Sequence, residues 1–148
     1  MEKGFIFGNK ILDIVIVSLL TAQTLKVIFY FFKEKKLNFR KYLDTGSMPS
    51  SHTASVISLA TAVGISEGVS SVFFAISAVF AIIVMYDATG VRQAVGKQAA
   101  VLNKIIESIH NREDFTLLEG RLKELIGHTP LEVLGGAILG VLIAFLMS

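Results

Sequence analysis

Four long apolar stretches dominate this chain, at residues 11–32, 49–65, 69–86 and 131–147. Each is close to the roughly 17 to 25 residues that a helix needs to cross the hydrocarbon core of a bilayer. The composition agrees, because 53% of the 148 residues are hydrophobic and only 18% are charged, which is atypical of a soluble domain. We therefore predict an all-α fold, an integral membrane helical bundle of about four transmembrane helices.

The segment between the third and fourth stretches has a different pattern. From Val91 the apolar residues recur at helical spacing, and charged or amide side chains occupy the other faces. This predicts an amphipathic helix that either continues the third span or lies along the membrane surface. A second short amphipathic piece follows at residues 117–126, so we expect residues 87–130 to contain a helical hairpin. No internal repeat or linker is visible, and residues 1–148 are interpreted as one membrane domain.

The distribution of positive charge predicts the orientation of the bundle. Residues 33–41 carry five basic side chains and one acidic one, whereas the turn at residues 66–68 carries no basic side chain. Loops rich in lysine and arginine face the cytoplasm in most membrane proteins. The loop at residues 33–41 should therefore face the cytoplasm. After two further spans the chain returns to the same side, so we expect residues 87–130 to be cytoplasmic as well, in a protein of the cell (plasma) membrane.

This topology brings several polar residues to one face of the membrane. His52, Arg92 and His128 fall on the cytoplasmic side, and Lys26 is close enough to the inner end of the first span to snorkel into the same layer. The net charge of +2 is too small to indicate a nucleic-acid partner. The chain has no cysteine, which excludes disulfides and thiolate chemistry. The pattern is compatible with a homo-oligomer.

The first of two histidine motifs is GSMPSSH at residues 46–52, at the start of an apolar stretch. Proline in the first turn and serine at the cap are typical of a helix start, so a purely structural interpretation is available. A helix start also attracts anions through its free amides, and a histidine in the first turn can donate a proton to a bound phosphate. On the second interpretation, Ser50 and Ser51 would bind phosphate and His52 would be the acid.

The second motif is GHTPLE at residues 127–132. Thr129 at the cap, proline at the first helical position and Glu132 three residues after the cap form the pattern of a capping box. Glu132 is also four residues after His128, where its carboxylate could orient the imidazole as a nucleophile. One carboxylate does not easily serve both purposes, and the sequence leaves the two roles open.

Two cations outside these motifs are candidates for holding phosphate. Lys26 lies within an apolar stretch, with Gln23 on the same helix face, and a lysine inside a span either marks a site or snorkels. Arg92 follows the third span, where its guanidinium suits phosphate oxygens, or where it could form an interfacial ion pair with Asp87. In the last span, Gly136 and the glycine four residues later form a small-residue face, which we interpret as a helix-packing surface.

Both histidine motifs resemble those of a known family. PSSH at residues 49–52 is similar to the P-S-G-H motif of the type 2 phosphatidic acid phosphatase superfamily, and HTPLEVLGG at residues 128–136 resembles its H-x-x-x-D motif with the glycine-bearing helix that follows. Nearly the whole chain, including residues 86–92, is similar to a small divergent branch described as related to acid phosphatases and vanadium-dependent haloperoxidases.

The resemblance implies a phosphomonoesterase that needs no metal and no cofactor. By this resemblance, His128 would attack phosphorus to form a phosphohistidine, Glu132 would orient it, and His52 would protonate the leaving alkoxide. Lys26 and Arg92 would hold the phosphate oxygens, with Gln23 and Asp87 in support. These roles suit phosphoryl transfer, in which catalysis is mainly positioning and charge stabilisation.

The chain departs from the family pattern at three places. Lys33 and Glu34 stand where the family has Arg-Pro after its lysine, and Glu132 stands where the family has aspartate. Leu122 stands where the family has the arginine that precedes the second histidine. Arg92 is our candidate replacement for that arginine, with Arg121 in reserve.

A cytoplasmic site at the membrane edge favours a lipid phosphate monoester as substrate, such as phosphatidylglycerol phosphate or phosphatidate, with polyprenyl phosphates less favoured. The predicted partners are therefore this lipid substrate and the surrounding lipid bilayer. An alternative from another class is a non-catalytic membrane protein that binds anionic lipids or scaffolds partners. A metal-dependent lipid phosphotransferase using Asp87 is less favoured, because the acidic residues lack a paired spacing on one helix that would hold magnesium.

Overall fold

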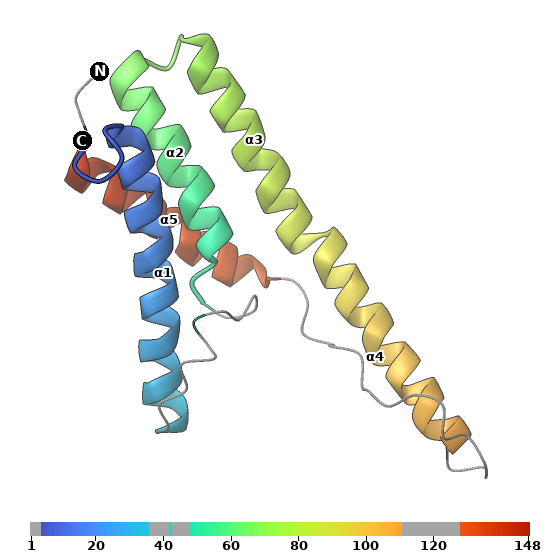
Figure 1. Cartoon of the computed structure of the whole chain (residues 1–148). Coiled ribbons are helices and arrows are strands. Elements are labelled where there is room, and N and C mark those ends of the chain that lie inside the picture. The colour runs from blue at the N-terminus through green and yellow to red at the C-terminus, as the bar shows by residue number, and fades with distance from the viewer. Residues whose placement is uncertain (1–3, 36–41, 43–47, 111–127) are drawn as a thin grey trace.

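The computed structural model describes residues 4–35, 42, 48–110 and 128–148. Five helices are present in these residues, and four of them form a bundle (Figure 1). Their bounds are α1 Lys10–Glu34, α2 Ser51–Glu67, α3 Val72–Thr89, α4 Val91–His110 and α5 Pro130–Met147. Helix α2 is the centre of the bundle, because it contacts α1, α3 and α5. The predicted all-helical fold is therefore confirmed.

Hydroxyl caps decide where three of the helices begin. The Ser50 hydroxyl accepts the Thr53 N–H at 3.3 Å at the start of α2, and the Ser71 hydroxyl accepts the Phe74 N–H at 3.1 Å at the start of α3. At the start of α5, Thr129 and Glu132 form a complete capping box with Pro130 in the first turn. These side chains supply the acceptors that free amides need at a helix N-terminus.

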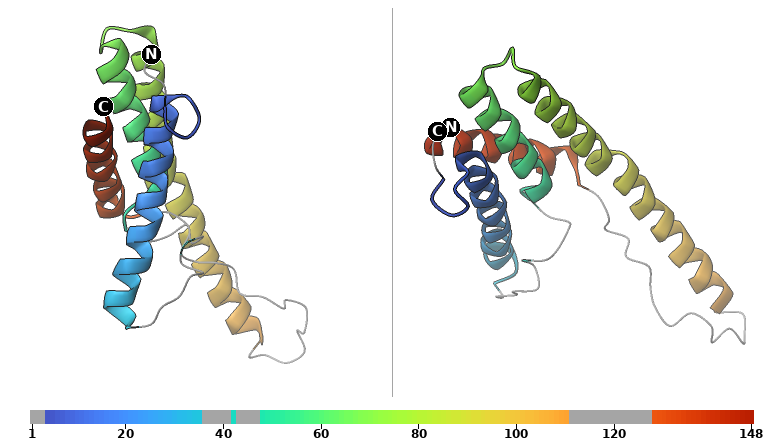
Figure 2. Two further views of the ribbon diagram at one scale, coloured as in Figure 1. Left: turned by 60° about the vertical axis from the view of Figure 1, so that its left-hand side comes forward. Right: turned by 45° about the horizontal axis from the view of Figure 1, so that its top comes forward.

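The directions of the helices gather distant residues at one end of the bundle. Helices α1 and α3 run antiparallel to α2, whereas α5 crosses α2 while running in the same direction (Figures 1 and 2). The starts of α2 and α5 therefore meet, since the Ser50 N–H donates to the Glu132 carbonyl at 2.9 Å. At the opposite end, Ile14, Ala62 and Ala144 pack together in a small apolar core.

Three segments are long and apolar enough to cross a membrane by length and composition: Lys10–Phe32, Val72–Ile106 and Pro130–Met147. The remaining predicted span, residues 49–65, corresponds to α2, which has 17 residues. Its central position explains its composition, because the residues that it buries are alanine, valine, serine and threonine. Helix α3 instead exposes large apolar side chains such as Phe73 and Ile82. The predicted count of four membrane crossings stays a prediction.

Helix α4 is the first arm of the predicted hairpin. It continues α3 beyond Gly90 and extends away from the other helices (Figure 1). The sequence allowed either a continuation of the third span or a helix lying along the surface, and the structure shows the continuation. The second arm, predicted at residues 117–126, lies outside the described residues.

The small-residue face of α5 packs directly on α2. A Cβ atom built on Gly140 would lie 2.6 Å from the Ala54 carbonyl oxygen, and one built on Gly136 would lie 3.0 Å from the Thr53 Cβ and collide with the Ser50 carbonyl oxygen. Only glycine therefore lets the two backbones approach so closely. The packing role predicted for this face is confirmed.

Replacing Gly136 with alanine is expected to destabilise the bundle by about 1–3 kcal/mol, because the methyl group meets backbone that cannot yield. Gly135→Ala is a matched control, since the closest contact of its Cβ would be the flexible end of Met48 at 3.0 Å, and its other contacts are at ordinary van der Waals distance. Alanine also favours a helix over glycine, so the control should unfold at the wild-type temperature or slightly above it. Thermal unfolding in detergent measures both. Equal stability of the two variants would contradict this account of the packing.

Candidate functional site

Two histidines from distant parts of the chain lie side by side at the end of the bundle where α2 and α5 begin. His52 is the second residue of α2, and His128 stands just before the Thr129 cap of α5. Their ring centroids are 6.4 Å apart and their planes are nearly perpendicular. His52 is exposed, whereas His128 is only 1% exposed. One imidazole is therefore open to a ligand and the other is enclosed by protein.

Backbone hydrogen bonds hold this pair in place. The Ser50 N–H donates to the Glu132 carbonyl at 2.9 Å, which ties the start of α2 to the first turn of α5. The His128 N–H donates to the Ala88 carbonyl at 3.0 Å, which ties the second histidine to the last turn of α3. Three helices thus fix the relative positions of the two rings. Ala88 contributes only its backbone carbonyl, so no side-chain pattern in the sequence could have predicted this contact.

Lys26 approaches the same end of the bundle from α1. Its Nζ donates to the Ser51 Oγ at 3.2 Å, and each of these two residues is only 2% exposed. Ser51 immediately precedes His52, so this hydrogen bond places a buried ammonium next to the turn that carries the exposed histidine. A charge in a low-dielectric interior interacts strongly with a nearby anion, so this ammonium can act as a counter-charge. The predicted role of Ser51 as a phosphate ligand stays a prediction.

Glu132 and Ser50 are both used by helix caps. The Glu132 Oε2 accepts the Thr129 N–H at 2.9 Å, and the Thr129 hydroxyl accepts the Glu132 N–H at 3.3 Å. Of the two roles left open by the sequence, the capping role is the one that the structure shows. The Ser50 hydroxyl accepts from both the Thr53 N–H and the Thr53 Oγ1, and Ser50 is fully buried. Both residues therefore shape the backbone under the histidines.

The structure describes the remaining predicted site residues to different extents. Gln23 is one helical turn before Lys26, and its Oε1 is buried without a hydrogen-bond partner in the described part of the chain. Asp87 lies in the last turn of α3, beside the residue that bonds to His128. Arg92 is in the first turn of α4, and its side chain is outside what the structure describes, as is the whole of Arg121.

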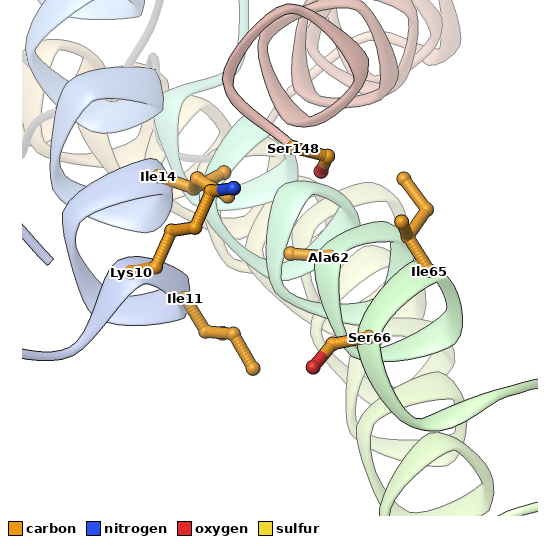
Figure 3. Close-up of a pocket in the computed structure, with 7 residues that line it drawn as sticks. All are labelled: Lys10, Ile11, Ile14, Ala62, Ile65, Ser66 and Ser148. Carbon is orange, nitrogen blue, oxygen red and sulfur yellow. The ribbon is translucent and has the colours of Figure 1, made fainter. Parts of the chain in front are cut away.

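A separate cavity of about 340 Å³ lies at the other end of the bundle, between α1, α2 and α5 (Figure 3). Lys10 reaches into it, and most of the wall is aliphatic. Neither histidine borders this cavity. The residues that line it are Lys10, Ile11, Ile14, Ala62, Ile65, Ser66 and Ser148.

A family model described as the divergent PAP2 family matches residues 7–143, which include α1 to α4, most of α5 and both candidate histidines. The chain belongs to the divergent PAP2 family. The match agrees with the family resemblance expected from the two histidine motifs. No solved structure matches the chain.

A relative of this divergent PAP2 protein is the uncharacterized membrane protein YuiD of Bacillus subtilis (strain 168). It is 39% identical over 140 residues, and the alignment covers 88% of this chain and 89% of the relative. The relative's description as a membrane protein agrees with the three apolar helices. The divergent PAP2 chain described here is accordingly a membrane protein.

Proposed function

We propose that this protein is a metal-independent phosphatase that hydrolyses a lipid phosphate monoester through a phosphohistidine. The observation that carries the proposal is the pairing of His52 with His128 at 6.4 Å, beside the buried Lys26. Membership of the divergent PAP2 family supports it. Because the pair lies at the end of membrane-spanning helices, the substrate class is a membrane lipid such as phosphatidate or phosphatidylglycerol phosphate.

The spacing of the two rings suits an in-line displacement. A nucleophile must come within about 3–3.5 Å of phosphorus, and a general acid must lie about 2.6–3.2 Å from the leaving oxygen. Adding one P–O bond, the two catalytic nitrogens should be about 7–8 Å apart in such a complex. The centroids of the two rings are 6.4 Å apart, which is close to this separation. We therefore expect a bound phosphoryl group to lie between the two imidazoles.

In the proposed reaction, a nitrogen of His128 attacks phosphorus while His52 donates a proton to the departing alkoxide. The lipid alcohol leaves, and phosphate is held covalently on His128. A water molecule then attacks phosphorus as His52 accepts its proton, which releases inorganic phosphate and restores both imidazoles. Lys26, with Arg92 as a further candidate, stabilises the charge on the phosphate oxygens. We expect the site to face the cytoplasm, from the basic residues at 33–41.

A non-catalytic lipid-binding or scaffolding protein is the second candidate. The observation that favours it is the capping bond of Glu132, because one carboxylate does not easily accept from the Thr129 N–H and orient His128 at the same time. On this alternative, the site would bind a phosphate headgroup without turnover. Phosphate release by the purified protein therefore distinguishes the two candidates.

Vanadate, an analogue of phosphate, tests the site itself. At about 100 times its Kd it should stabilise the wild-type protein by about 2.7 kcal/mol, seen as a higher unfolding temperature in detergent. Lys26→Met should abolish this protection, because the apolar replacement removes the ammonium that faces the anion. The variant itself should stay folded, since replacing a buried charge by an apolar side chain of similar volume is often neutral or stabilising.

Lys10→Met is the matched control for this experiment. It removes a lysine from the same helix at the opposite end of the bundle, so vanadate protection should persist. Ser51→Ala should weaken protection without abolishing it, because Lys26 loses the hydroxyl that positions it but keeps its charge. Full vanadate protection in Lys26→Met would contradict the assignment of Lys26 to the phosphate site.

A further inference from the structure

Residues 4–9, which we name the N-terminal loop, expose three large apolar side chains in a row. Phe5 is fully exposed, and Ile6 and Phe7 are 61% and 57% exposed. The loop stands at the end of the bundle opposite the two histidines and leads directly into α1 (Figure 1). Neither the phosphatase proposal nor the packing of the helices uses these side chains.

A buried carboxylate holds the N-terminal loop in a defined shape. Asp13, only 3% exposed, accepts the Ile6 N–H at 2.9 Å and the Phe7 N–H at 3.0 Å. Asn9 caps α1 by accepting the Leu12 N–H at 3.2 Å, and Gly8 has a φ of +70°, in the region that favours glycine. The loop is thus bound to the first turn of α1 through its backbone, and its apolar side chains point outward.

This arrangement has the properties that a lipid environment requires. Backbone amides that enter a bilayer must be paired within the protein, because the hydrocarbon offers no partner. Asp13 supplies acceptors to the amides of two of the three apolar residues. Phenylalanine and other large apolar side chains also insert at the boundary between headgroups and acyl chains in interfacial segments, and the N-terminal loop directly precedes a helix long and apolar enough to span.

We propose that the N-terminal loop is a membrane anchor, in which Asp13 presents Phe5, Ile6 and Phe7 to the interfacial region of the leaflet at the end of the bundle opposite the histidines. The occupant is lipid because the loop is continuous with the exposed apolar side chains of α1, such as Leu12 and Leu20. Residues 4–9 carry no charged side chain, and Lys10 at the start of α1 turns into the cavity between α1, α2 and α5 (Figure 3). The contact made by the described residues of the loop is therefore apolar.

The chain contains no tryptophan, so Phe5→Trp gives a single reporter in the full-length protein. In neutral phosphatidylcholine vesicles, we expect a blue-shifted emission, strong quenching by phosphatidylcholine brominated near the top of its acyl chains, and little quenching by aqueous acrylamide. When Asp13→Ala is added, acrylamide should quench the emission more strongly than the brominated lipid does, because the unpaired amides of the loop then favour water.

Other outcomes would overturn the proposal. A water-like emission with strong acrylamide quenching in Phe5→Trp alone would show that the loop does not enter the bilayer, whether or not the Asp13 variant folds. A blue shift without bromolipid quenching, lost when the protein is diluted into excess lipid, would assign the apolar surface to a second copy of the chain. Unchanged quenching after Asp13→Ala would overturn the role of the carboxylate.

Discussion

Replacing His128 with glutamine is expected to reduce phosphate release from a lipid phosphate monoester to the background rate, a loss on the order of 10⁴-fold or more, as for removal of a catalytic nucleophile. Glutamine keeps a polar side chain of similar length in a site that is only 1% exposed, so the bundle should still fold. The measurement is phosphate release by purified protein in mixed micelles, in a chelator that removes divalent metals.

A second measurement ties this loss to covalent chemistry. Wild-type protein incubated with a radiolabelled lipid phosphate and quenched in base should carry label that acid removes, because a phosphohistidine is stable to base and labile to acid. His128→Gln should carry none. His110→Gln is the matched control, since it removes the other histidine outside the candidate pair, at the far end of α4, and should keep both turnover and label. Undiminished turnover in His128→Gln would rule out the proposed mechanism.

Replacing His52 with glutamine is expected to slow hydrolysis of an alkyl phosphate by about 10²–10⁴-fold, the usual contribution of a general acid. The same change should affect an aryl phosphate such as p-nitrophenyl phosphate much less, because a stable phenolate leaves without a proton. His52 is exposed on the first turn of α2, where a leaving group can reach it. Initial rates on both substrates, compared as a ratio between variant and wild type, measure the effect.

The ratio separates catalysis from structural damage. If His52 only supported the fold, its loss would slow both substrates equally, and the ratio would match that of wild type. An equal loss on both substrates would therefore contradict the role of general acid while leaving the nucleophile untested by this comparison. The His128 experiment tests the nucleophile independently, because the label measures phosphate bound to the protein after the leaving group has departed.

Much of the fold could be predicted because its determinants are local. The bounds of the predicted spans at residues 11–32, 69–86 and 131–147 lie within three residues of those of α1, α3 and α5. The capping box at Thr129 is a contact between residues three apart, so its pattern is visible in the sequence. The predicted stretch at residues 49–65 lies within two residues of the bounds of α2, and the small and hydroxyl residues of this helix serve packing against three neighbours.

The candidate site was only partly predictable because its contacts are long-range. The histidines were identified from their positions at helix starts, and the structure places their rings beside each other. Glu132 had two compatible roles at the same spacing, and the hydrogen bond to the Thr129 amide shows the capping role. The role of Ser51 as a phosphate ligand stays a prediction, and its hydroxyl accepts from Lys26, a residue 25 positions earlier in the chain.

The sequence by itself determined the helical membrane class, the helix starts and the chemical types of the candidate residues, because hydropathy, capping and side-chain chemistry depend on neighbours within a few residues. Only the tertiary structure decided that α5 runs in the same direction as α2 and crosses it through Gly136 and Gly140. That crossing brings His128 to His52, and the antiparallel α1 brings Lys26 to Ser51. Such a meeting depends on how whole helices pack, since close backbone approach is a property of two surfaces together.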